Sequence, residues 1–211
     1  MKFMKPKVTV YSDYICPFCL IGKERVDKLE EEFKADVEWR GFEIHPETPR
    51  EGRTIKDLNM DKGYIEMMRD NVMKLAKEAK VNIKFPSRIS NSRLALEISE
   101  YAKEKGKFRE FHSAIFNAYW QEDRDIGNMM FLFKTAKEVG LDVGELKEYL
   151  KDGRARKKLS EYLDEIRRYM ITGVPTFIIG DKIIVGAQPY KVLKKTIEEE
   201  FAKEGGKSEI T

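Results

Sequence analysis

At the start of the chain, the hydrophobic pattern changes from that of a strand to that of a helix. Residues 7–14 are rich in β-branched and aromatic side chains, which favours a strand. From Pro17 onward, positions three and four residues apart fit one face of a helix, namely Gly22, Val26, Leu29 and Phe33. Proline suits the first helical turn, where its missing N–H costs nothing. The pattern therefore predicts a strand followed directly by a helix.

Apolar and polar residues alternate again over residues 36–44, which predicts a second strand. Gly41 interrupts the alternation, so we expect a bulge or a change of register near it. Residues 45–49 contain two prolines that end the strand, and residues 50–62 look like an irregular connection. His45 follows the strand and could approach an active site, although a surface or partly buried position is favoured.

Helical spacing dominates the next hundred residues. Apolar residues at this spacing predict helices that begin near residues 65, 94, 108, 132, 143 and 159, with a short extended segment at 81–86. A cluster of aromatic residues in the third helix could line a ligand pocket, but its helical spacing favours core packing: Phe108, Phe111, Phe116, Tyr119 and Trp120. His112 lies in the same helix and fits a core or polar-face residue better than a catalytic base.

The strand pattern returns near the C-terminus. Residues 176–179 and 182–185 are β-type runs joined by Gly180 and Asp181, a two-residue hairpin signal. A final helix through residues 190–201 is expected to stop at Gly205 and Gly206, and residues 205–211 are expected to be disordered.

In order, the chain reads β-α-β, then a long helical stretch, then β-β-α. The first two strands flank a crossover helix, so they should be parallel. The pattern predicts an α/β domain formed by residues 6–50 and 170–204, with residues 60–169 as an inserted helical subdomain.

Composition limits the classes of function. The 211 residues carry a net charge of +3, from 40 basic and 37 acidic residues mixed along the chain. Residues 154–158 are the densest basic run and fit a solvated helix face, so we expect no nucleic-acid partner. No apolar run approaches the ~18 residues of a membrane span, and residues 1–7 lack the apolar region of a secretory signal.

We therefore expect a cytoplasmic protein without a membrane partner. In the cytoplasm, a cysteine pair that cycles between dithiol and disulfide is more usual than a permanent disulfide. Lys and Glu are abundant while Gln occurs only twice, a bias seen in hyperthermophiles. Intracellular disulfides are less exceptional in such organisms.

The two cysteines, Cys16 and Cys19, stand at the predicted strand–helix junction in the order Cys16, Pro17, Phe18, Cys19. A helix N-terminus favours the thiolate form, which is the nucleophile in disulfide exchange, and cysteines so placed have pKa values of about 3.5–7.5. We expect Cys16 to attack substrates. Cys19, one turn further along, should be less exposed and should act as the resolving thiol.

Three alternative roles for the cysteine pair are less favoured than a redox role. A structural disulfide across so short a loop would remove little entropy from the unfolded chain. A metal site would need two more ligands, and the sequence has no second cysteine or histidine pair at zinc-like spacing. Inert thiols at this junction are the remaining alternative.

Two further segments complete a resemblance. Residues 12–22 around the cysteines, the Gly-Phe-Glu-Ile-His-Pro phrase at 41–46, and Gly-Val-Pro-Thr-Phe at 173–177 together resemble the DsbA family, most closely its FrnE-like cytoplasmic branch. The resemblance covers roughly residues 6–203. It implies a thioredoxin fold with an inserted all-helical subdomain.

The resemblance also implies roles for individual residues. Cys16 matches the attacking cysteine and Cys19 the resolving one. Pro175 matches a cis-proline that faces the disulfide, and Val174 matches the residue whose backbone pairs with an extended substrate. Pro17 and Phe18, between the cysteines, are also expected to contact substrate.

Two positions depart from the family pattern. Strongly oxidising members carry His within the motif, whereas Phe18 supplies no hydrogen-bond donor, so we expect a weaker oxidant. Relatives often bury an acidic residue on the first strand, but Val10 is apolar and the nearest acid is Asp13. Asp13 could shuttle protons to Cys19 or close a turn, and the turn is slightly favoured.

The predicted function is thiol–disulfide oxidoreduction, with the Cys16–Cys19 disulfide as the redox group and no other cofactor or metal. Partners would be a protein or small-molecule thiol or disulfide and a recycling redox protein; nothing in the sequence indicates an oligomeric state. One alternative is a glutathione-dependent kappa-class-like transferase or isomerase, which typically has Ser in place of the attacking cysteine. Another is a non-enzymatic module whose cysteines bind zinc across a dimer.

Overall fold

A four-stranded mixed sheet forms the centre of the fold. The structure, a computed structural model, describes residues 5–58 and 61–207. The strands are in the order β2 (Asp36–Gly41), β1 (Lys7–Ser12), β5 (Thr176–Ile179) and β6 (Lys182–Val185). β1 is parallel to β2 and antiparallel to β5, and β5 and β6 form the predicted hairpin. The order and direction of these strands confirm the α/β prediction.

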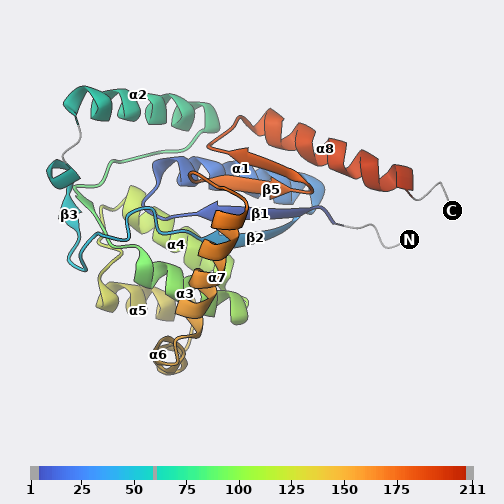
Figure 1. The fold of residues 1–211 in the computed structure, drawn as a ribbon. Coiled ribbons are helices and arrows are strands. Elements are labelled where there is room, and N and C mark those ends of the chain that lie inside the picture. Colours follow the sequence, from blue (N-terminus) through green and yellow to red (C-terminus); the bar gives the residue numbers. More distant parts are fainter. Residues whose placement is uncertain (1–4, 59–60, 208–211) are drawn as a thin grey trace.

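Helices cover both faces of this sheet (Figure 1). On one face, α1 (Pro17–Phe33) and α8 (Tyr190–Lys207) pack on Val8 and Val10 of β1 through Val26, Leu29, Leu193 and Ile197. On the other face, Tyr11 of β1 packs against Tyr162 and Ile166 of α7 (Arg154–Arg168). Because side chains alternate along β1, the strand contributes to one apolar layer on each face of the sheet.

The segment between β2 and β5 supplies the other helices. These are α2 (Lys62–Ala79), α3 (Arg93–Glu104), α4 (Phe108–Trp120), α5 (Met129–Glu138) and α6 (Val143–Lys151), followed by α7. Their apolar side chains form the largest core cluster, which includes Phe111, Phe116 and Trp120 and also contains Cys16 and Cys19. The aromatic cluster of α4 is therefore core, as predicted, and the cysteine pair lies where the helical part meets the sheet.

The connections around β2 differ from the prediction. The register of β1 and β2 is regular from Lys7 opposite Asp36 to Ser12 opposite Gly41, so the expected bulge is absent from this pairing. Gly41 instead lies in a closely packed position: a Cβ there would lie 3.0 Å from the side chain of Leu159 and 3.2 Å from that of Leu96. β2 ends at Gly41, earlier than expected.

Two short strands were not predicted. β3 (Arg53–Thr54) pairs with β4 (Arg88–Ile89), and a single 3-10 turn covers Ile55–Leu58, where the sequence indicated an irregular connection. Strands of two residues contain no periodicity that a sequence pattern could reveal.

The end of α8 also differs. The helix continues to Lys207 through Gly205 and Gly206, so the predicted stop was wrong. A glycine inside a helix costs about 1 kcal/mol relative to alanine, which weakens a helix without ending it. The rest of the expected disordered tail, residues 208–211, lies outside the described residues.

Within the described ranges, no helix combines the length and apolar character needed to cross a lipid bilayer.

Candidate functional site

The cysteine motif occupies the junction between β1 and α1. Cys16 is the N-cap of α1 and has an extended backbone, with φ −88° and ψ 118°, and Pro17 is the first helical residue. The carbonyl oxygen of Cys16 accepts hydrogen bonds from the backbone N–H groups of Cys19 (3.1 Å) and Leu20 (3.4 Å). Both cysteines are free thiols. The structure thus confirms that Cys16 stands at the helix N-terminus, where the unpaired N–H groups of the first turn favour a negative charge.

The two sulfurs differ in their surroundings. Cys16 is 4% exposed to solvent, and Cys19 is fully buried. Burial raises the pKa of the Cys19 thiol well above its usual value, and the neighbouring Cys16 sulfur raises it further. The backbone amide of Asp13 and the hydroxyl of Ser12 oppose this shift. Cys19 is therefore held as a neutral thiol in this state of the protein.

The loop before β5 lies against Cys16. The Cys16 Sγ donates a hydrogen bond to the carbonyl oxygen of Val174 at 3.5 Å, and the Val174–Pro175 bond is cis, as predicted. The Thr176 hydroxyl donates to the carbonyl oxygen of Gly173 at 2.6 Å, which closes the loop. Because β5 pairs with β1, the sheet itself brings this loop to the cysteines.

A close approach between α1 and this loop fixes their separation. A Cβ at Gly22 would lie 3.1 Å from Cγ of Pro175 and 3.2 Å from Cζ of Phe177. Such contacts are tighter than most in proteins, so only glycine fits without displacing the proline. Gly22 therefore permits the packing of α1 on Pro175.

The predicted substrate contacts have unequal exposure. Pro17, Phe18 and Val174 are half-buried and border Cys16, whereas Pro175 is buried. The first three side chains therefore reach the surface beside Cys16, and Pro175 lies beneath it.

Asp13 closes a turn, as the sequence slightly favoured, but it also connects the segments that follow β1 and β2. Its carboxylate accepts hydrogen bonds from the backbone N–H groups of Ile44 (2.8 Å) and Ile15 (3.4 Å), and its carbonyl oxygen accepts one from Cys16 N–H (3.2 Å). The N–H of Ile44 is thereby occupied by Asp13, which agrees with the early end of β2. Burial raises the pKa of Asp13 to about 7, against the lowering effect of the Ile44 N–H, the Ser92 side chain and the Ile15 N–H.

The helical part holds the backbone just before Cys16. Trp120 of α4 donates from Nε1 to the carbonyl oxygen of Tyr14 at 2.8 Å, and the hydroxyl of Tyr14 bonds that of Ser99 at 2.6 Å. These contacts were not predicted, because Trp120 and Tyr14 are 106 residues apart. Their aromatic character predicted burial but not this pairing.

Neither histidine contributes to the cysteine site. His45 is partly buried, as favoured, with its Nδ1 3.2 Å from Glu47 and 3.3 Å from Arg53. His112 is buried among the rings of Trp39 and Phe108, at centroid distances of 4.5 and 4.7 Å. Burial lowers the pKa of His112 well below its usual value, so it is a neutral core residue.

Within residues 5–58 and 61–207, no group of three or more Cys, His, Asp or Glu side chains is arranged to hold a metal ion. The described residues of a single chain therefore do not provide the ligands of a zinc site.

The sequence and the fold match one family over most of the chain. The profile of the DSBA-like thioredoxin domain matches residues 7–198. The chain belongs to the DSBA-like thioredoxin domain family. Its members carry a thioredoxin-like fold and include thiol–disulfide oxidoreductases.

Three similar proteins illustrate the range of this family. The chain is 35% identical over 206 residues to the uncharacterized protein YwbO of Bacillus subtilis, covering 95% of this chain and all of YwbO. A probable DsbA oxidoreductase of Streptomyces coelicolor superimposes with a TM-score of 0.82 at 23% identity, over 93% of this chain and 90% of that one. The 2-hydroxychromene-2-carboxylate isomerase of Pseudomonas putida is 19% identical, over 83% of this chain and 86% of the isomerase.

Proposed function

We propose that this chain is a thiol–disulfide oxidoreductase of the FrnE-like cytoplasmic branch, in which Cys16 and Cys19 alternate between dithiol and disulfide. The observation that carries the proposal is the position of Cys16: its sulfur lies at the N-terminus of α1 and contacts Val174 of the cis-proline loop. Substrates are protein or small-molecule thiols and disulfides, and a separate redox protein restores the starting state.

The reaction proceeds by two exchanges. The Cys16 thiolate attacks one sulfur of a substrate disulfide, the substrate S–S bond breaks, and the leaving thiolate takes up a proton. Cys19 then loses its proton and attacks the Cys16 sulfur, which forms the Cys16–Cys19 disulfide and releases the second substrate thiol. Two electrons pass from the cysteine pair to the substrate. The reverse sequence oxidises a substrate dithiol.

The second exchange requires a proton acceptor because Cys19 is buried as a neutral thiol. Asp13 is fully buried, its backbone N–H is among the groups that lower the pKa of the Cys19 thiol, and the pKa of its own carboxyl is raised to about 7. A carboxyl with that pKa can take up or release a proton near neutral pH. In this proposal Asp13 accepts the Cys19 proton as well as closing the turn.

Substrate binding follows from the exposure of the site. An extended substrate segment pairs with the backbone at Val174, and Pro17 and Phe18 supply apolar contact on the other side of Cys16. No cofactor beyond the cysteine pair is required by this scheme.

Single-cysteine variants test the proposal. With a dye-labelled disulfide peptide as substrate, the unmodified chain should catalyse exchange, and Cys16→Ser should abolish it. Cys19→Ser should accumulate a mixed disulfide between Cys16 and the peptide, detectable as a mass increase that reductant removes. Retention of exchange by Cys16→Ser would contradict the proposal.

The role of Asp13 is tested separately by the rate at which Cys19 resolves the Cys16–peptide mixed disulfide, in chains that keep both cysteines. In the unmodified chain, the rate of peptide release should rise with pH through an inflection near neutral pH. Asp13→Asn should slow release and remove the inflection. An unchanged rate profile would leave Asp13 with a structural role only.

A second candidate is a glutathione-dependent isomerase, which the similarity to the Pseudomonas putida isomerase favours. Such an enzyme needs no resolving thiol. Isomerisation of 2-hydroxychromene-2-carboxylate in the presence of glutathione, unaffected by Cys19→Ser, would support it. A colorimetric zinc assay on the purified chain tests the zinc-binding module.

A further inference from the structure

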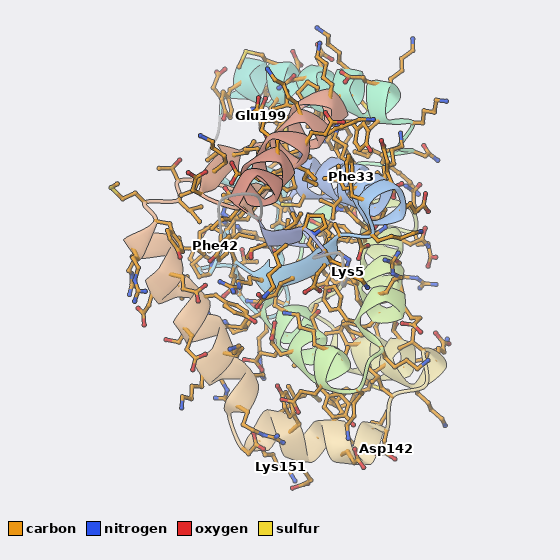
Figure 2. All side chains as sticks on the ribbon, turned by 90° about the vertical axis from the view of Figure 1, so that its right-hand side faces the viewer. Lys5, Phe33, Phe42, Asp142, Lys151 and Glu199 are labelled. Atoms are coloured by element: carbon orange, nitrogen blue, oxygen red, sulfur yellow. The ribbon has the colours of Figure 1, made fainter. Side chains whose placement is uncertain are left out.

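A second concave surface lies away from the cysteine site. It has a volume of about 820 Å³ and lies between the loop after β2, the start of α3, α5, and the α6–α7 connection. We call it the basic groove and define it by the basic side chains Arg50, Arg93, Lys147, Lys151 and Arg156. Figure 1 shows α5 and α6 on the opposite side of the sheet from α1. Lys151 marks the end of α6, at the end of the molecule farthest from α8 (Figure 2).

The lining of the basic groove is strongly asymmetric in charge. Against its five basic side chains stands one acidic residue, Glu97, which is 7% exposed. Arg156 lies 3.8 Å from the Glu97 carboxylate, so this one acidic side chain is paired with one of the five basic ones. The groove therefore carries a net positive charge.

Acidic neighbours outside the groove compensate only part of this charge. Arg93 pairs with Glu43 at 2.7 Å, and Lys151 pairs with Glu148 at 2.6 Å. The Lys151 pair is highly exposed on both sides, and such pairs contribute little. In the part of the chain that the structure describes, Arg50 and Lys147 have no carboxylate within ion-pair distance, and the charge of Arg50 acts on Glu97 from further away.

Apolar side chains line the space between these cations. Leu94, Phe133 and Leu150 are half-buried, and Met129 is 54% exposed. The Lys147 ammonium lies 5.7 Å from the centroid of the Phe133 ring, so charge and apolar surface are in direct contact. Apolar side chains next to cations suit a ligand that has both an anionic group and a hydrocarbon part.

We propose that the basic groove binds a small amphipathic anion. Its carboxylate or phosphate head is held by Arg50, Lys147 and Arg156, and its hydrocarbon part covers Leu94, Phe133 and Leu150. An inorganic anion would leave these apolar side chains exposed to water, and a neutral hydrocarbon would leave the cations without a counter-charge. The volume falls in the range of about 300–1,000 Å³ that is typical of small-molecule sites. This site is independent of the proposed redox function.

Matched ligands test the head and the tail separately. Isothermal titration of the full chain, below the critical micelle concentration, compares decanoate, decyl phosphate, decan-1-ol and inorganic phosphate. We expect one decanoate or decyl phosphate bound per chain, with at least tenfold weaker binding of decan-1-ol and of inorganic phosphate. The tighter of the two amphiphiles identifies the preferred head group.

Variants locate the binding. Arg50→Gln combined with Lys147→Gln changes two exposed side chains and should weaken binding at least tenfold without changing the thermal midpoint. Phe133→Ser should weaken binding through the tail. Lys134→Gln, on the same helix as Phe133 and 75% exposed, is the matched control and should bind normally. Cys16→Ser should also bind normally, since the site is separate from the cysteines.

Three results would overturn the proposal. These are no binding of either amphiphile, equal binding of decan-1-ol, or binding that the Arg50 and Lys147 substitutions leave unchanged. Tighter binding of an acidic decapeptide than of decanoate would instead identify a polypeptide site and contradict the small-ligand proposal.

Discussion

Cys16 and Cys19 are one helical turn apart and differ in burial. Cys16 keeps 4% of its exposed area and Cys19 none, and burial raises the pKa of Cys19. Since alkylation requires an accessible thiolate, iodoacetamide at pH 7 should label Cys16 well before Cys19. Peptide mass mapping after short reaction times measures the order.

The control for this prediction is Cys16→Ser, in which Cys19 should remain slow to react. Faster labelling of Cys19 than of Cys16 in the unmodified chain would reverse the assignment of attacking and resolving thiols.

Asp13 gives the protein a specific dependence of stability on pH. Its pKa is raised from 3.8 to about 7 in the folded chain. Between these pH values the folded chain holds a proton that the unfolded chain has released, so the free energy of unfolding falls as pH rises, by at most about 1.4 kcal/mol per pH unit. The stabilisation that comes from the protonated Asp13 carboxyl is fully present below pH 3.8 and is lost above the folded-state pKa.

Asp13→Asn cannot titrate and keeps an oxygen that can accept from Ile44. The free energy of unfolding of Asp13→Asn minus that of the unmodified chain should therefore increase from pH 5 to pH 7 and level off above about pH 8. Urea unfolding at several pH values measures it. Asp70→Asn, on the exposed side of α2, should show no such slope; a pH-independent difference for Asp13→Asn would contradict the raised pKa.

Individual positions show what sequence could and could not reveal about the site. The two cysteines and Pro17 are adjacent in sequence, so the strand–helix junction and the N-cap position of Cys16 were predictable from local pattern. The placement of Val174 beside Cys16 came from the family resemblance, because 158 residues separate them. The burial of Asp13 depends on Ile44, 31 residues away, and no local pattern contains that contact.

At the scale of elements, α1 and β5 are held together at Gly22. An added Cβ would lie 3.1–3.2 Å from Pro175, whose ring cannot rotate away. Gly22→Ala gains up to about 1 kcal/mol of helix propensity, but overpacking of a core typically costs about 1–3 kcal/mol. We expect a net loss of stability and slower disulfide exchange, because the loop is displaced from Cys16. Urea unfolding and the peptide exchange assay measure the two effects.

Gly173 provides the matched control for this substitution. It lies in the same loop, and an added Cβ there would meet nothing within 4 Å. Gly173→Ala should leave stability and exchange nearly unchanged. If Gly22→Ala behaved like Gly173→Ala in both measurements, the close approach of α1 to Pro175 would not matter for the reaction.

The elements that sequence predicted best are those defined by local contacts. β5 and β6 have the predicted bounds because their two-residue turn and β-type runs are contiguous. The interpretation of Gly41 failed because the residues that require it, Leu96 and Leu159, belong to distant helices. The end of α8 was misplaced because glycine lowers helix stability without deciding where the helix stops.

At the scale of the whole molecule, the helical segment completes the environment of the cysteines rather than standing apart from it. Cys16 and Cys19 share one core cluster with α2–α6, and Trp120 and Ser99 hold Tyr14 in place. The helical part therefore packs against the cysteine pair and fixes the backbone that precedes Cys16. Periodicity predicted these helices, but which of their side chains meet the cysteine loop required the three-dimensional structure.

The proposed redox function also implies a reduction potential for the cysteine pair. Phe18 has no hydrogen-bond donor in its side chain, and the carbonyl oxygen of Val174, which contacts Cys16 Sγ, cannot donate to the sulfur. The neighbouring Cys19 thiol is buried beside Cys16. Strong oxidants of the DsbA type stabilise the reduced form and have reduction potentials of about −120 mV, whereas thioredoxin has one of about −270 mV. With the helix N-terminus as the main stabilising feature, we expect an intermediate potential.

Equilibration of the chain with glutathione buffers of defined ratio tests whether Cys16 and Cys19 form a reversible redox pair, with the Cys16–Cys19 disulfide quantified by mass after acid quenching and alkylation. We predict one reversible two-electron transition at about −180 to −230 mV, close to the values of protein disulfide isomerase and glutaredoxins. A potential near about −120 mV would show that groups other than those around Phe18 set the poise. Failure to form a reversible Cys16–Cys19 disulfide at any ratio would contradict the assignment of this protein as a dithiol–disulfide oxidoreductase.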